Sequence, residues 1–339
     1  MGTVALLSLT NVTKYGGCAT YTAHLAFSMR ALGIEPEIYC VGRSTESGLR
    51  RYTHGLFYQN ISIDAALTIS DKKPSVIVYS NWSSHALAIT RLISNGLPLV
   101  MHDPAELAPE LIELCGDVHV IAIRRLMRDR LVAMGVDCQF IPHPYVRSCT
   151  NESRVVGGGD AVAWGRVDFR KHTDIVCVAN DILKLKGIGT IGIYGSINRM
   201  FAFHKLDKLF PGWRANYHGQ PPPTSDVFIQ VCRGRHAVID LTRIESDGDG
   251  SQYVFLEAWD VGTPLIVNRG WIHTGSDEVR HGETAIAIAT AEELVEAVNS
   301  PLGDMGLVEG GYEQLRIHEP SQVVPAYLRV MGISAGTDW

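Results

Sequence analysis

The segment AVIDLTRIESDGDGSQYVFLEAWDVGTPLIV, residues 237–267, decides the fold class. Its apolar start is typical of a buried strand, and a glycine-rich acidic loop, a helical pattern, a Gly-Thr-Pro turn and a second apolar run follow in order. This order predicts one strand–helix–strand unit of a parallel sheet. The loop offers backbone N–H groups and the positive end of a helix dipole to an anion, while Asp249 and Glu257 offer acceptors to hydroxyl groups. A sugar attached to a phosphate carries both kinds of group.

Length and composition favour a globular enzyme with two α/β domains. A chain of 339 residues is too long for one ordinary core. Its 46% apolar residues are sufficient for the cores of two domains. Its seven cysteines are odd in number and scattered, which argues against a disulfide framework or a zinc site and fits a reducing cytoplasm. The apolar start, residues 1–9, resembles a buried strand and not a signal peptide, and no run approaches the roughly 20 apolar residues of a membrane span. A net charge of −6 argues mildly against a polyanionic partner, although a local basic groove is compatible with it.

The first half of the chain alternates strand-like and helical patterns. Strands are predicted at residues 37–41, 75–79, 97–101, 118–122 and 138–141, after a first strand at the N-terminus. This alternation predicts a doubly wound parallel sheet. In such sheets ligands bind outside the carboxyl ends of the strands, which is where Gly16-Gly17 and His102-Asp103 fall.

A stretch rich in proline and glycine, residues 142–159, reads as a linker, after which the alternation starts again. We therefore expect a first domain at 1–147, a second at 160–318, and a C-terminal helix and tail at 319–339 that cross back to the first domain. The role of the Pro221–Pro223 loop is left open.

Basic residues follow the first strand of the second half. Arg166 and Lys171 lie near a predicted helix start, where two fixed positive charges suit a departing diphosphate. Taken alone, a solvated basic turn is the better interpretation of this pair, and an ordinary tight turn is the better interpretation of Gly16-Gly17. Their value comes from the combination.

The combined motifs resemble retaining nucleotide-sugar glycosyltransferases of the GT-B fold, of the family four type. The motifs are Gly16-Gly17 before a helix, His102-Asp103 after a strand, Gly165-Arg166 with Lys171, and Asp249 with Glu257 before Gly262-Thr263-Pro264. The resemblance spans nearly the whole chain and implies an α/β architecture of two Rossmann-like domains with parallel sheets facing a central cleft.

The resemblance also assigns roles to residues. It implies that Arg166 and Lys171 hold the diphosphate of a UDP-sugar, that Glu257 binds the ribose, and that Asp249 binds hydroxyls of the transferred sugar. Gly250 and Ser251 would complete the donor loop, as Gly16 and Gly17 would on the first domain. No nucleophile is implied, because same-face attack would be assisted by the donor phosphate.

The acidic pair departs from the usual pattern. Asp249 is one methylene shorter than the usual glutamate, and Asp247 competes with it for the sugar contact. The Asp247-Gly248-Asp249 triplet also imitates a D-x-D metal motif. That motif belongs to a single-domain glycosyltransferase architecture, so we expect no strict metal requirement.

A second, more local resemblance concerns the acceptor. Residues 195–203, followed by 213–219, are similar to a segment of bacteriophage DNA α-glucosyltransferases, which also carry a His-Asp at the position of His102-Asp103. This implies a donor contact from Arg199, UDP-glucose as donor and hydroxymethylpyrimidine in viral DNA as acceptor, within a host cytoplasm. The alternative is that Arg199 caps a surface helix while Phe201 and Phe203 fill the core.

A DNA acceptor requires a basic surface. The candidates for phosphate contacts are Arg50, Arg51, Arg124 and Arg128, the first two in a predicted loop and the last two on one helix face. Such clusters are more often solvated surfaces. If they bind DNA they confer little sequence choice, and the acceptor base has to leave the stack.

His102 and Asp103 complete the catalytic candidates beside Arg166 and Lys171. His102 is expected to hydrogen-bond the transferred sugar, and Asp103 to orient or deprotonate an acceptor hydroxyl. A buried structural His-Asp turn is the alternative. Two other functions stay open: transfer to a cell-envelope saccharide or lipid-linked glycan, and nucleotide-sugar binding without catalysis.

Overall fold

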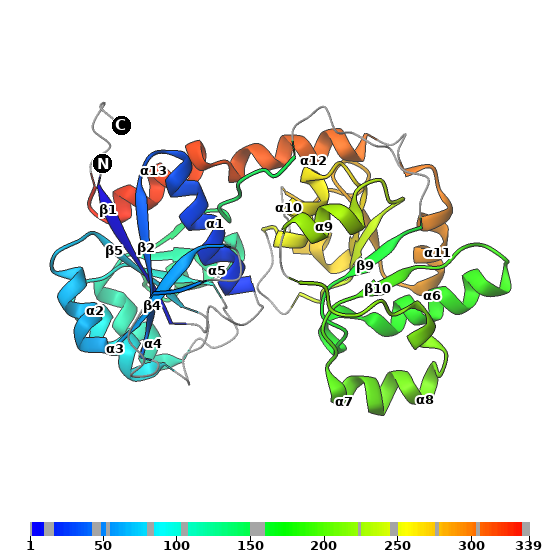
Figure 1. Ribbon diagram of the computed structural model, residues 1–339, viewed down its shortest axis with the longest axis horizontal. Helices are drawn as coiled ribbons and strands as arrows, with labels where there is room; N and C mark the ends of the chain where they lie inside the picture. Colours follow the sequence, from blue (N-terminus) through cyan, green and yellow to red (C-terminus); the bar gives the residue numbers. More distant parts are fainter. Residues whose placement is uncertain are drawn as a thin grey trace. The chain divides into compact units, whose positions relative to one another are not determined.

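The computed structural model describes residues 2–9, 17–42, 49–51, 55–79, 85–102, 108–149, 160–222, 225–244, 250–274, 278–302 and 306–333. The chain forms two compact units, which are treated separately below (Figure 1). The first unit comprises Met1–Val146, Ser246–Gly250 and Arg316–Trp339, and the second comprises Arg147–Glu245 and Ser251–Leu315.

The first unit is built on an eight-stranded sheet of order β3-β4-β2-β1-β5-β6-β7-β8. All neighbouring strands are parallel except β3 and β4. The bounds are β1 (Thr3–Ser8), β2 (Glu35–Val41), β3 (Leu49–Arg51), β4 (Phe57–Ile61), β5 (Ser75–Tyr79), β6 (Leu99–Met101), β7 (Val120–Ala122) and β8 (Cys138–Phe140).

Helices cover both faces of this sheet, so its central strands are apolar on both sides. Leu7 and Ile77 face a core shared with α2 (Ile63–Ser70), α3 (Ala86–Ile93), α4 (Pro109–Leu114) and α5 (Arg125–Ala133). Outside this core, α1 (Gly17–Ala31) packs against α13 (Pro320–Val330), as Figure 1 shows. The C-terminal residues therefore group with the first unit.

The second unit is built on a five-stranded, wholly parallel sheet of order β10-β9-β11-β12-β13. Its strands are β9 (Val162–Trp164), β10 (Gly192–Tyr194), β11 (Val238–Asp240), β12 (Leu265–Asn268) and β13 (Ile286–Ile288). The predicted strand–helix–strand unit is confirmed as β11, α10 (Tyr253–Asp260) and β12, with Val238 paired to Leu265.

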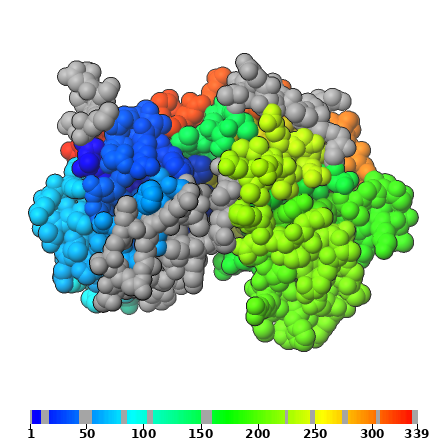
Figure 2. Space-filling view, viewed as in Figure 1, coloured from blue at the N-terminus to red at the C-terminus, as the bar shows by residue number. Residues whose placement is uncertain are grey.

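Helices also lie on both sides of the second sheet. One core contains side chains from α6 (Thr173–Leu185), α7 (Arg199–Phe201) and α11 (Ala291–Asn299), and α10 packs with α9 (Ser225–Cys232) and α12 (Leu307–Leu315) elsewhere. The α7 helix continues through a π-helical stretch, Ala202–Leu206, into α8 (Asp207–Leu209). Figure 2 shows this stretch as an exposed lobe of the second unit.

The sequence-based expectations differ from the structure in a few elements. β3, β4 and β13 were not predicted, and Arg50 and Arg51, predicted to lie in a loop, belong to the edge strand β3. β3 is a three-residue edge strand of sequence LRR, and its polar composition conceals it. Phe201 is buried in the core, whereas Phe203 is 61% exposed. In the described part of the chain, no helix has the length and apolarity that a membrane span requires.

Candidate functional site

Two glycine turns shape the carboxyl edge of the second sheet. Gly165 follows β9 and Gly195 follows β10, with φ of 146° and 145°. A Cβ on Gly195 would lie 1.7 Å from the carbonyl oxygen of Gly165, so only glycine lets these turns touch. The Val167 N–H donates to the Ser196 carbonyl at 2.8 Å, and this ties the two loops together. The loop that carries Arg166 therefore lies beside the turn that leads to Arg199.

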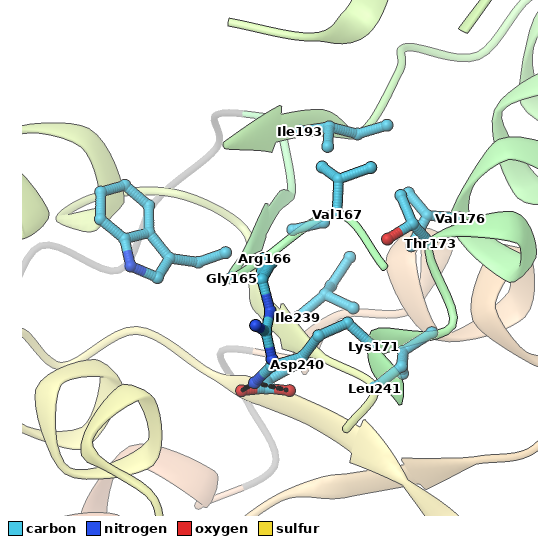
Figure 3. A pocket seen from close by; sticks show the side chains of 12 residues that line it. Gly165, Arg166, Val167, Lys171, Thr173, Val176, Ile193, Ile239, Asp240 and Leu241 are labelled. Carbon is cyan, nitrogen blue, oxygen red and sulfur yellow. Dashed lines mark hydrogen bonds and ion pairs between the residues drawn. The ribbon is translucent and has the colours of Figure 1, made fainter. Parts of the chain in front are cut away.

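A small pocket opens at this edge (Figure 3). Its cavity volume is about 20 Å³, which is room for about one water molecule. A larger ligand has to bind across its open side, where the Arg166 side chain is 60% exposed. The lining residues come from the ends of β9, β10 and β11 and from the start of α6: Ala163, Trp164, Gly165, Arg166, Val167, Lys171, Thr173, Val176, Ile193, Ile239, Asp240 and Leu241.

Lys171 is held by a buried carboxylate at the end of β11. Its Nζ donates to Asp240 Oδ2 at 2.9 Å, to Asp240 Oδ1 at 3.1 Å and to Gln252 Oε1 at 3.3 Å. Figure 3 shows the Lys171 and Asp240 side chains meeting in the pocket wall. Asp240 also accepts from the Thr242 N–H at 2.8 Å and from the Thr242 hydroxyl. The ammonium group is thus fixed in place and its charge is balanced.

Arg166 has a second acid beside it. Its Nε lies 2.5 Å from Asp168 Oδ2, and Asp168 is buried. Asp168 Oδ1 also accepts from the N–H groups of Arg170 and Lys171, which caps the short 3₁₀ helix Phe169–Lys171. The two positive and two negative formal charges of these pairs cancel. An incoming anion therefore competes with two carboxylates for the same two cations.

Sequence reasoning missed Asp168 and Asp240. For Asp240, the available signal in the sequence was an acidic residue at the end of the apolar run VID. In the structure this aspartate is only 1% exposed. Burying an ionised aspartate costs free energy unless the carboxylate is paired, and a cation is the partner that lowers this cost most.

Helix α10 carries Glu257, whose half-buried carboxylate has no hydrogen-bond partner among the described residues. Burial, with a smaller contribution from the charge of Asp260, raises its pKa to about 8. Asp260 is buried one turn further on and accepts from the Ser148 N–H at 2.6 Å. A half-buried acid with a raised pKa and no hydrogen-bond partner among the described residues is typical of a ligand site.

The loop before α10 is anchored by a residue that the sequence analysis did not select. The Ser251 hydroxyl donates to Glu278 Oε2 at 2.5 Å, and both side chains are buried. Ser251 therefore has a structural partner in Glu278. Gly250 precedes it and groups with the first unit.

In the first unit, His102 follows β6 and lies against the start of α1. A Cβ on Gly17 would be 2.8 Å from His102 Cε1, so glycine is needed for this approach. Burial, assisted by the positive charge of Arg124, lowers the pKa of His102 to about 3. Its buried Nε2 has no hydrogen-bond partner in the described part of the chain. The structure thus places an uncharged imidazole with a spare polar atom beside Gly17.

The other selected residues are distributed as follows. Arg199 is exposed at the start of α7. Arg124 precedes α5, and its positive charge helps to lower the pKa of His102. Arg128 pairs with Asp129 at 2.6 Å. The side chains of Arg50 and Arg51 are not described. Gly16, Asp103 and the Asp247 to Asp249 triplet lie outside the described residues. Within the described ranges, no group of three or more metal-ligating side chains is found.

Comparison with solved structures establishes the fold. No protein-family model and no curated protein matches the sequence. Anabaena Alr3699/HepE in complex with UDP is 12% identical, with a TM-score of 0.67 over 98% of this chain and 100% of that chain. An alpha-glucosyltransferase in complex with UDP and a 13-mer DNA containing an HMU base is 12% identical, with a TM-score of 0.70 over the same shares.

Two further neighbours extend the comparison. Sucrose-phosphate synthase from Thermosynechococcus elongatus is 14% identical, with a TM-score of 0.71 over 98% of this chain and 100% of that chain. S. aureus TarM, in complex with Fondaparinux, alpha-GlcNAc-glycerol and UDP, is 8% identical with a TM-score of 0.69 over the same shares. These neighbours are GT-B glycosyltransferases, so the predicted GT-B fold is confirmed.

Proposed function

We propose that this protein is a retaining glycosyltransferase that moves glucose from UDP-glucose to a hydroxyl acceptor, with hydroxymethylpyrimidine in DNA as the first acceptor to test. The observation that carries the proposal is the pair Arg166 and Lys171 at the carboxyl edge of the second sheet, each fixed by a buried carboxylate. Solved neighbours in complex with UDP and with UDP-glucose support the choice of donor.

The two cations would stabilise the leaving diphosphate. As the bond between the sugar C1 and the phosphate oxygen breaks, negative charge grows on that oxygen, and preorganised cations are most effective where charge develops. Arg166 is paired with Asp168 but its side chain is 60% exposed, so a ligand can reach it from solvent, whereas Lys171 is held in the pocket wall by Asp240. The acceptor oxygen forms the new bond to C1 on the same face, and its proton passes to the departing phosphate oxygen.

Glu257 would bind the ribose of the donor. Two ribose hydroxyls donating to its carboxylate favour the ionised form, which burial disfavours in the free protein. Donor binding is therefore coupled to release of a proton near neutral pH. Asp249 is proposed to bind hydroxyls of the sugar.

His102 would bind the transferred sugar as a neutral imidazole. Its unpartnered Nε2 either accepts from a sugar hydroxyl or donates to one, depending on the tautomer. Asp103 is proposed to orient the acceptor hydroxyl, and Arg199 to contact the donor.

The acceptor is the least constrained part of the proposal. DNA is favoured by the neighbour crystallised with HMU-containing DNA, and a cell-envelope saccharide or lipid-linked glycan by the neighbour crystallised with alpha-GlcNAc-glycerol. The phosphate contacts proposed for DNA are Arg50, Arg51, Arg124 and Arg128. Non-catalytic binding of a nucleotide sugar is the remaining alternative.

A transfer assay separates these possibilities. Radiolabelled UDP-glucose and other UDP-sugars are incubated with hydroxymethylated duplex DNA, with the unmodified duplex and with envelope glycans, using Arg166→Ala as the low-activity control. Label in the hydroxymethylated duplex alone supports the proposal. Label in glycans alone would show that the acceptor is a glycan and not DNA. Binding of UDP without transfer or donor hydrolysis would refute the catalytic assignment.

A further inference from the structure

Two aromatic rings, those of Tyr21 and His143, meet the His102 ring edge to face. The centroid of the His102 ring lies 5.5 Å from that of Tyr21 at 70°, and 5.9 Å from that of His143 at 89°. Tyr21 and His143 also contact each other, at 6.0 Å and 74°. Both are buried, so they restrict the imidazole from two directions while its Nε2 keeps no partner among the described residues.

Both neighbours of His102 are held by residues 316–330, here named the C-terminal segment. The hydroxyl of Tyr327, on α13, hydrogen-bonds that of Tyr21 on α1, a pair 306 positions apart in the chain. His318 Nδ1 lies 2.7 Å from the carbonyl oxygen of His143. The N–H of Tyr145 donates to the carbonyl of His318 at 2.8 Å.

These contacts are polar, although packing alone would need only apolar groups. Tyr21 and Tyr327 are both 0% exposed, and phenylalanine at the two positions would fill nearly the same volume without a buried hydroxyl. A satisfied buried polar pair contributes little net stability, but it selects one geometry among many. Fixed geometry is what a hydrogen-bonding imidazole requires, because small displacements of a functional group reduce its effect.

We propose that the C-terminal segment is a positioning element of the site, in which Tyr327 acts through Tyr21, and His318 through the His143 backbone, to fix the ring orientation of His102. The identity of the ligand group that meets Nε2, a hydroxyl of the transferred sugar, rests on the proposed function. The fixing of the ring does not. Tyr21, Tyr327 and His318 are positioning residues and touch no substrate.

The kinetic test removes the hydroxyl pair. Tyr327→Phe removes the Tyr327 hydroxyl that bonds to Tyr21, and the double variant with Tyr21→Phe removes both hydroxyls of the pair. We expect kcat to fall about tenfold in both variants with KM changed less than about twofold, as for a misplaced group. In a His102→Ala background the same substitutions should change kcat less than about twofold.

Tyr58→Phe is the matched control, because Tyr58 is a buried tyrosine on β4, separated from β6 by β2, β1 and β5 in the same sheet. It should leave kcat within about twofold of the wild type. Equal losses from Tyr327→Phe with and without His102 would show a merely structural role for the hydroxyl pair and overturn the proposal.

A second measurement does not depend on turnover. In protein labelled at histidine Cε1, the His102 signal is assigned by its loss in His102→Ala, and its line shape is compared among variants. We expect one sharp signal in wild type and Tyr58→Phe, and a shifted or broadened one in Tyr327→Phe and the double variant. An unchanged His102 signal in both overturns the positioning role even if the enzyme is active. If no UDP-sugar is turned over, the proposed function fails and this spectrum still decides the inference.

Discussion

Replacing Glu257 with glutamine should stabilise the protein and weaken donor binding at the same time. Burial and the charge of Asp260 hold the pKa of Glu257 at about 8, above the ordinary value of 4.5. Between these two pH values the folded protein keeps a proton that the unfolded chain releases. Stability therefore falls as the pH rises through this window and is constant above about 8. Glutamine does not ionise, so the variant escapes that loss.

The size of the effect follows from the shift. One pKa unit corresponds to about 1.4 kcal/mol, so a rise from 4.5 to about 8 sets a ceiling of about 5 kcal/mol above pH 8. The side chain is half-buried, and water reaches part of it. We therefore expect the variant to be more stable by about 1 to 2 kcal/mol at pH 8.5, and by much less at pH 5.

Urea denaturation at pH 5 and pH 8.5 measures this difference, with Glu296→Gln, an exposed site on α11, as the control. Calorimetry with UDP should show about tenfold weaker binding to Glu257→Gln, and proton release on binding to the wild type. Binding of UDP to the wild type should tighten as pH rises toward 8. A stability gain that is equal at both pH values would refute charge burial as its cause, and unchanged UDP affinity would refute the ribose role.

Three other substitutions probe the second unit. Asp240→Asn removes the carboxylate that competes for Lys171, so UDP should bind about fivefold tighter. The value of kcat should fall, because Asp240 no longer positions the lysine, and tighter binding with unchanged kcat would contradict that positioning role. Arg166→Ala should lower kcat/KM on the order of 100-fold, and near-wild-type turnover would exclude it from the diphosphate site. Gly195→Ala should destabilise the protein by several kcal/mol, because its Cβ would lie 1.7 Å from a backbone carbonyl oxygen. Gly187→Ala, whose Cβ would meet nothing within 4 Å, should cost only about 1 kcal/mol. Equal unfolding midpoints for the two variants would refute the steric argument.

Hydrophobic periodicity and turn residues were enough to predict the alternating architecture. The run 237–241, the loop and the Gly-Thr-Pro turn correspond to β11, α10 and β12, because these signals act over a few residues. The edge strand β3 escaped prediction because its three residues, LRR, carry no apolar pattern.

The support of the site was beyond sequence reasoning. Asp240 could be placed at a strand end, but its partner Lys171 lies 69 positions away and nothing local pairs them. The same holds for Tyr21 and Tyr327, 306 positions apart, whose contact exists only because α13 packs on α1. Local patterns thus identify which residue types stand at strand ends, while the acids and rings that fix them depend on tertiary contacts.

The cancelled charges beside the pocket affect how a donor would arrive. Two ion pairs, Arg166 with Asp168 and Lys171 with Asp240, present little net field beyond a Debye length of about 8 Å at physiological salt. Free phosphate and stray polyanions would not be concentrated there, and association with a UDP-sugar should proceed at a rate that depends little on ionic strength. Selection among anions is then made at contact, by whether a ligand can displace a carboxylate from a cation, and not by attraction from a distance.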